Sequence, residues 1–187
     1  MGLTNMSALD LPAIQYTVWP ADLHSHHYQV KLHITNPDPK GQILQMPAWI
    51  PGSYLIRDFS KHIESIAAFT SDSAKKKIAL QRLDNNQWLL PAVNGAVDII
   101  TTIYAFDNSV RAAYLDTERG FFNATSLCLM VKGQTHVPCS LAIAAPEDVY
   151  AELWTVQTSL TPAKTDARGF GFYLAANYDD LIDHPVA

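Results

Sequence analysis

The chain has 187 residues, of which 48% are hydrophobic, so it can bury a core as one domain over residues 1–187. Its formal net charge of -5 excludes the basic surface that nucleic-acid binding requires, and no apolar run approaches the roughly 20 residues of a membrane span. The first twelve residues have neither the basic nor the apolar part of a signal peptide. We therefore expect a cytoplasmic protein, or a periplasmic one if a leader has been removed.

Alternation of apolar and polar residues, which is typical of half-buried strands, runs through most of the chain. It is strict in residues 28–35, and a turn with Pro and Gly follows at residues 36–41. Residues 97–106 are apolar on both faces, which predicts a strand between two layers. Further strands are expected at residues 42–49, 126–131, 138–144 and 170–176, with a hairpin of 77–83 and 87–90 across 84–86 and a short helix at 178–182. Residues 62–70 have partly helical spacing, but a strand that ends at residue 69 fits the neighbouring strands better. The predicted fold class is all-β, an antiparallel β-sandwich or saddle-like pair of sheets with a short C-terminal helical turn.

Several side chains have reactive chemistry, but none of them belongs to a complete catalytic or metal-binding motif. His24 and His26 would share one face of a strand and could hold a metal together, yet a third ligand is missing, and an exposed strand start is the favoured interpretation. Cys128 and Cys139 are spaced for neither a zinc knuckle nor a redox pair, so both are expected to be buried free thiols. We expect no catalytic residue and no metal ligand in this chain.

The segment from Trp49 to Asp58 is richer in Trp, Tyr and Arg than a solvent-exposed turn requires. Pro51-Gly52 favours a tight turn after a strand, and this turn would place Tyr54, Arg57 and Asp58 at the edge of a sheet. In one interpretation Trp49 is core and Arg57 holds loop carbonyls. In the other, the segment faces a cleft or an interface, where these residue types are enriched.

A second segment, residues 109–123, lies between two predicted strands and is too long for a tight hairpin. Long loops on β-sandwiches often carry function. Phe122 and Asn123 at its end are therefore the second pair of candidate cleft or interface residues.

Taken in order, these segments resemble the N-terminal domain of metallopeptidase family sixty-one, the glycyl aminopeptidase-like enzymes, many of which carry a PDZ domain. The most specific element is residues 49–59, Trp-Ile-Pro-Gly-Ser-Tyr-Leu-Ile-Arg-Asp-Phe. The supporting stretches are residues 28–30, 86–88, 109–111, 120–123, 154–160 and 178–186. The resemblance covers nearly the whole chain.

The resemblance implies an N-terminal β domain followed by a thermolysin-like catalytic domain with an HExxH zinc motif, and often by a PDZ module. No HExxH is present in this sequence, so the zinc and the general base are implied to lie in a catalytic domain outside it. The implied role is to dock on that domain and help wall the cleft for a peptide substrate, with no activity of its own. The docking face could also let the isolated domain self-associate.

An alternative hypothesis is a free-standing ligand-binding β-sandwich, for example a carbohydrate-binding module. It requires Trp49, Tyr54 and Trp88 to form one exposed aromatic face on which sugar rings can stack. Burial of Trp49 and Trp88 in the core would argue against it.

Overall fold

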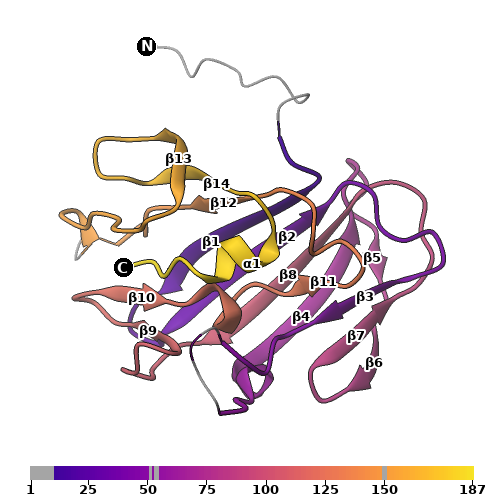
Figure 1. Cartoon of the computed structure of the whole chain (residues 1–187), viewed down its shortest axis with the longest axis horizontal. Helices are drawn as coiled ribbons and strands as arrows, with labels where there is room; N and C mark the ends of the chain where they lie inside the picture. The colour runs from indigo at the N-terminus through magenta and orange to yellow at the C-terminus, as the bar shows by residue number, and fades with distance from the viewer. Residues whose placement is uncertain (1–10, 51, 53–54, 149–150) are drawn as a thin grey trace.

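The computed structural model describes residues 11–50, 52, 55–148 and 151–187, which form strands joined by loops and short helical turns (Figure 1). The largest sheet has eight strands in the order β13-β14-β12-β1-β2-β8-β4-β5. β1 pairs with β12 in parallel, and the other neighbours are antiparallel. Its strands are β1 (Ile14–Asp22), β2 (His27–Ile34), β4 (Ile63–Thr70), β5 (Lys77–Ile78), β8 (Val97–Tyr104), β12 (Cys139–Ile143), β13 (Thr161–Thr165) and β14 (Gly171–Ala175).

Two smaller sheets and three helical turns complete the described fold. A four-stranded sheet in the order β11-β3-β7-β6 consists of β3 (Gln42–Gln45), β6 (Gln81–Asp84), β7 (Gln87–Leu90) and β11 (Met130–Val131). β9 (Ala113–Leu115) and β10 (Gly120–Phe122) form a separate hairpin. The helical turns are η1 (Phe59–His62), η2 (Ala124–Ser126) and α1 (Tyr178–Ile182). Figure 1 places the β9–β10 hairpin and the C-terminus together on the left, away from β6.

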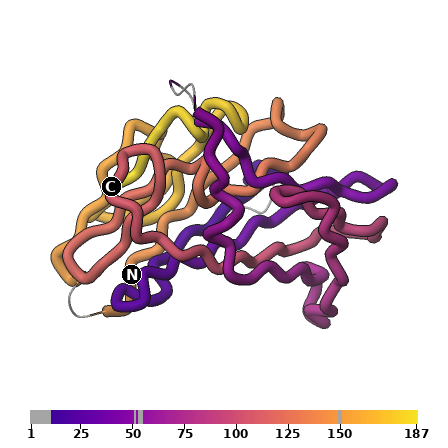
Figure 2. The backbone as a smooth tube through the Cα atoms, turned by 90° about the horizontal axis from the view of Figure 1, so that it is seen from below, coloured from indigo at the N-terminus to yellow at the C-terminus, as the bar shows by residue number. Residues whose placement is uncertain are grey.

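One hydrophobic core joins the two larger sheets, and its members come from every second residue of the central strands. In β2, Tyr28, Val30, Leu32 and Ile34 are buried, while the residues between them are half-buried. Burying such a side chain contributes about 1.5–3 kcal/mol, so a one-residue slip in register would be costly. Seen from below in Figure 2, the yellow C-terminal segment lies above the indigo strands of the N-terminal part.

The predicted all-β fold class is confirmed. The strands expected at residues 28–35, 62–69, 138–144 and 170–176 appear as β2, β4, β12 and β14, and the helix at 178–182 appears as α1. Asn177 caps α1, because its side chain accepts a hydrogen bond from the backbone N–H of Asp180 at 2.9 Å. Cys128 and Cys139 are buried free thiols, as expected.

Other predicted elements are wrong in type or extent. Residues 126–131 form the end of η2 and the short β11 instead of one strand, and β3 ends at Gln45 instead of Trp49. Residues 77–83 split into β5 and β6, which belong to different sheets. His24 and His26 lie in the turn between β1 and β2, with His26 at φ 61°, so they do not share a strand face.

Four strands are absent from the predicted elements. β1 is one of them, although its residues alternate clearly from Ile14 to Val18. β13 contains Pro162, and a proline makes a strand hard to recognise in a sequence. β9 and β10 lie inside the segment predicted as a long loop, which is therefore a hairpin across residues 116–119.

Candidate functional site

A pocket of about 460 Å³ lies on the side of the molecule where the chain ends. The β9–β10 hairpin, residues 153–156 and residues 186–187 surround it. Its lining is mostly aromatic and aliphatic, and polar side chains come from the hairpin connection, from Asn108 and from Thr155. We refer to it below as the hairpin pocket; its aromatic lining residues are Tyr28, Tyr114, Phe121, Phe122, Trp154 and Phe170.

Residues 186–187 form part of the wall of the hairpin pocket. Val186 exchanges two backbone hydrogen bonds with Phe122, at 2.9 and 3.0 Å. Ala187 exchanges two with Gln157 on the other side, at 2.7 and 3.0 Å. The end of the chain is thus held like a short strand between β10 and the segment before β13.

The hairpin itself is held in place by a stack of planar side chains. The Arg119 guanidinium lies 4.9 Å from the centre of the Tyr114 ring, and Tyr114 stacks on Phe106 with ring centres 5.2 Å apart. Phe106 stacks in turn on His26 at 3.9 Å. His26 Nδ1 donates to the carbonyl of Leu115 at 2.6 Å. This stack fixes β9 against the turn between β1 and β2 and so fixes one wall of the pocket.

Asp116 shapes the connection between β9 and β10. Although burial disfavours its charged form, hydrogen bonds from the Tyr114 hydroxyl and from the backbone N–H groups of Arg119 and Glu118 lower the pKa of its carboxyl. The same contact raises the pKa of the Tyr114 hydroxyl, chiefly because that hydroxyl donates to the carboxylate at 2.7 Å. Asp116 is therefore an ionised turn former at neutral pH.

The rim of the hairpin pocket exposes large apolar side chains. Leu153 is 93% exposed and Val110 is 73% exposed. Both residues line the pocket, so the exposed apolar surface is continuous with its interior. An exposed apolar surface that leads into an apolar pocket is typical of a binding site.

Residues 55–58, in the second half of the segment from Trp49 to Asp58, form a second exposed surface, which we call the Arg57 loop. Leu55 and Ile56 are exposed, and Arg57 is half-buried. The Arg57 backbone N–H donates to the carbonyl of Ala48 at 2.7 Å, which closes the base of the loop. Gly52 has the positive φ, 75°, that the predicted turn requires.

The candidate residues differ in their surroundings. Tyr54 lies outside the described residues, and Asp58 is exposed and accepts a hydrogen bond from the Ser60 hydroxyl at 2.6 Å. Phe122 is buried in the core. Asn123 is buried too, where its side chain caps η2 by accepting from the backbone N–H and the hydroxyl of Thr125.

The two candidate segments nevertheless meet in space. η1 directly follows Asp58, η2 directly follows Asn123, and the two helical turns contact each other. Residues 153–156 and 186–187 also line the pocket, which was not predicted from the sequence. The adjacent apolar residues Leu153 and Trp154 are the only signal for it there.

Trp88 is 6% exposed and belongs to the core between the sheets. Trp49, by contrast, is 52% exposed. The aromatic face required for carbohydrate stacking therefore lacks Trp88, which argues against that alternative.

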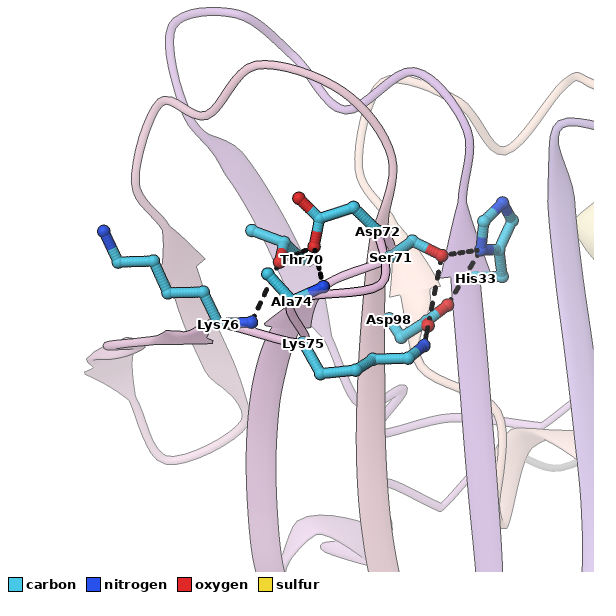
Figure 3. A network of polar contacts seen from close by, with 8 residues as sticks. All are labelled: His33, Thr70, Ser71, Asp72, Ala74, Lys75, Lys76 and Asp98. Atoms are coloured by element: carbon cyan, nitrogen blue, oxygen red, sulfur yellow. Dashed lines mark hydrogen bonds and ion pairs between the residues drawn. The ribbon is translucent and has the colours of Figure 1, made fainter.

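Among the residues drawn in Figure 3, four polar side chains form one network that joins β2, β8 and the connection between β4 and β5: His33, Ser71, Lys75 and Asp98. Asp98, buried on β8, accepts from Lys75 Nζ at 2.9 Å and from the Ser71 hydroxyl at 3.1 Å, and its other oxygen lies 2.8 Å from His33 Nδ1. Ser71 and Asp98 both contact the same ring nitrogen of His33. His33 therefore cannot pass a proton from Ser71 through its ring to Asp98, and the arrangement is not a catalytic triad.

Burial disfavours the charged form of Asp98, yet hydrogen bonds from Lys75, His33 and Ser71 lower the pKa of its carboxyl. The network ties the connection between β4 and β5 to the sheet, and it holds Lys75 at a positive φ of 45°. Its role is structural. Among the described residues, no group of three or more His, Cys, Asp or Glu side chains is placed to hold a metal ion. No helix in the described part of the chain is long and apolar enough to span a bilayer.

Comparison with known proteins gives two kinds of match. Residues 15–187 match the family model described as the Peptidase M61 N-terminal domain. Among solved structures, an aminopeptidase N family protein from Idiomarina loihiensis is 43% identical with a TM-score of 0.87, over 92% of this chain and 28% of that one. An M1 zinc metallopeptidase from Deinococcus radiodurans is 6% identical with a TM-score of 0.45, over 95% of this chain and 41% of that one. No curated protein sequence matches the chain.

Proposed function

Because the chain belongs to the Peptidase M61 N-terminal domain family, we propose that it is one non-catalytic domain of a zinc-dependent aminopeptidase, docking on a catalytic domain and helping to form the substrate cleft. The chain spans only 28% of the length of the 43% identical structure. The catalytic domain, its zinc and its peptide substrate are therefore parts of the proposal.

The observation that carries the proposal is the position of residues 186–187 in the wall of the hairpin pocket. An N-terminal domain passes its chain to the next domain at its C-terminal end. Any residue that follows Ala187 starts beside this pocket, so a domain that follows begins next to the exposed Leu153 and Val110. These side chains are suited to being covered, because burying each of them would contribute about 1.5–3 kcal/mol.

In the proposed enzyme, the catalytic domain and this chain have different roles. The zinc of the catalytic domain would polarise the water that attacks the amide. This chain would supply apolar walls through the hairpin pocket, and polar rim groups through Asn108, Glu118 and Arg119. The stack from Arg119 to His26 would keep that wall rigid, and a rigid wall positions a substrate better than a mobile loop.

The first test reads the gene downstream of the codon for Ala187. The proposal expects an HExxH motif within roughly the next hundred codons. It also expects the purified 187-residue chain to release no product from aminoacyl p-nitroanilides and to retain no zinc after dialysis. Turnover or tightly held zinc in the chain alone would refute the assignment of a non-catalytic domain.

The second test measures docking. The segment encoded after residue 187 is co-expressed with this chain, and the dissociation constant of the complex is measured by sedimentation velocity. Leu153→Ser should weaken the complex by roughly tenfold or more, since a buried leucine is lost. Leu83→Ser is the matched control, because Leu83 is also exposed but lies on β6, away from the C-terminus (Figure 1). Equal affinities for both variants would place the docking surface elsewhere.

A further inference from the structure

The last two residues of the sequence form the middle strand of a small antiparallel sheet. Val186 pairs with Phe122 of β10 through two backbone hydrogen bonds. Ala187 pairs with Gln157 on the opposite side in the same way. The direction is antiparallel on both sides, because Val186 forms antiparallel bridges with Phe122 and with Thr158. The register on each side is therefore fixed.

On one side, β10 extends two residues beyond this pair, to Gly120. Residues two apart in an antiparallel strand direct their backbone N–H and C=O groups to the same side. Phe122 directs its groups toward Val186, so Gly120 directs its own the same way, away from β9. The Leu115 N–H agrees with this, because it donates to the carbonyl of Ala105 and not to β10. A residue at position 188 would lie opposite Gly120.

The opposite side has the same alternation. Gln157 pairs with Ala187, whereas the N–H of Val156 points the other way and donates to the carbonyl of Arg168 at 2.7 Å. Thr155 therefore faces the same side as Gln157, and a residue at position 189 would lie opposite it. Each of the two positions after Ala187 thus has a backbone donor and acceptor directed at it.

A side chain at position 188 would point into the hairpin pocket. Val186 is buried and Ala187 is exposed, and successive side chains of a strand alternate between its faces. Position 188 thus shares the inward face of Val186, between Gly120 and Val156, which both line the pocket. A Cβ on Gly120 would lie 3.3 Å from the Trp154 ring, so this face leads to the aromatic lining.

The lining of the hairpin pocket determines which side chain fits there. An apolar cavity of about 150 Å³ is large enough to hold benzene, and this pocket has about 460 Å³. A glycine on one strand leaves room that a large apolar side chain across the sheet can fill. A charged side chain in an apolar lining would lose its water without gaining partners. The pocket therefore favours a large apolar residue at position 188.

We propose that the segment following Ala187 continues this strand for two residues through the hairpin pocket, with a large apolar side chain at position 188 and the backbone of position 189 paired with Thr155. The inference rests on the proposed function, because it requires a following segment. It specifies how the two domains are joined, namely by a shared sheet instead of a flexible linker. The strand leaves the polar side chains of the rim to the proposed cleft.

The test extends the 187-residue chain by designed tripeptides of identical composition. One variant adds Leu-Ser-Gly and the other adds Ser-Leu-Gly, so that the leucine stands at position 188 or at position 189. Only the first variant directs the leucine into the pocket, and it should melt at least about 3 °C higher than the second. Equal melting temperatures would overturn the inference, because unspecific apolar contact does not depend on the register.

Hydrogen exchange tests the backbone pairing separately. In the 187-residue chain, the amides of Gly120 and Thr155 should exchange faster than those of Phe122 and Gln157, which are already hydrogen-bonded. Adding Leu-Ser-Gly should slow the exchange of the first two amides by roughly fivefold or more. Unchanged exchange at both amides would show that no strand forms, and would overturn the inference even if the melting temperature rises.

The natural sequence after Ala187 distinguishes this inference from the proposed function. If an HExxH motif follows but position 188 is charged and the designed leucine gives no shift, the strand is wrong and the proposed function stands. If position 188 is large and apolar and both extension tests succeed, but no catalytic domain follows, the strand stands and the proposed function fails. If no residue follows Ala187, both fail together.

Discussion

Gly120, in β10, offers a sharp test of how the hairpin pocket is packed. A Cβ at this position would lie 2.5 Å from the Tyr28 hydroxyl oxygen and 3.3 Å from the Trp154 ring. Tyr28 is buried and meets Phe122 edge-on, with ring centres 5.6 Å apart, so its hydroxyl can give way only by disturbing this contact or by turning into the pocket that it lines. Overpacking of this kind costs about 1–3 kcal/mol. For a chain of this size, Gly120→Ala should then lower the melting temperature by about 2–4 °C per kcal/mol.

A double-mutant cycle separates the clash from other effects. Tyr28→Phe removes the clashing oxygen together with its 3.3 Å hydrogen bond to the carbonyl of Tyr114, at a cost of about 0.5–1.5 kcal/mol. The double variant should therefore lose less stability than the two single losses added together. Urea unfolding followed by tryptophan fluorescence gives each free energy of unfolding.

Gly133→Ala is the control for the cycle. Gly133 has a φ of 82° and no heavy atom within 4 Å of its Cβ position, so alanine there strains the backbone without touching Tyr28. Its loss should add to that of Tyr28→Phe within about 0.5 kcal/mol. If Gly120→Ala and Tyr28→Phe are equally additive, the steric reasoning is refuted.

Three further predictions concern single groups. Because the pKa of Asp98 is lowered from 3.8 in the folded chain, its ionised carboxylate should stabilise the fold fully above pH 3.8, and this stabilisation should be lost as the pH falls through the lower, folded pKa. Asp98→Asn should therefore reduce the loss of unfolding free energy at acidic pH, as measured by urea unfolding, and an unchanged loss would contradict the prediction. Burial raises the pKa of the thiols of Cys128 and, to about 12, of Cys139, so a disulfide reagent at pH 8 should label both only after unfolding, and rapid labelling of the native chain would be the contrary result. Asn123→Ala should lower the unfolding free energy by about 1 kcal/mol, because it removes the η2 cap over Thr125. Asn123→Asp should restore most of that free energy, as measured by calorimetry of both variants; no recovery would show that the side chain has a role beyond capping.

The sheet could be predicted where a strand has one buried and one exposed face. β2 reads directly from its alternation, because each second residue enters the core. Residues 127–129 are all buried as well, yet they follow a helical turn. A short apolar run without alternation cannot show whether it belongs to a strand or to a helical segment. β9 and β10 are three residues each, which is too short for a period, and they depend on distant partners such as Phe106 and His26.

The two candidate surfaces differ in the same way in how far the sequence predicts them. The Arg57 loop could be suspected from the sequence, since a turn that combines Trp, Tyr and Arg is unusual for a solvated connection. The hairpin pocket could not, because it forms only when residues 153–156 and 186–187 meet β10 across the fold. Pairing over such separations in sequence is decided by tertiary packing, which no local pattern records.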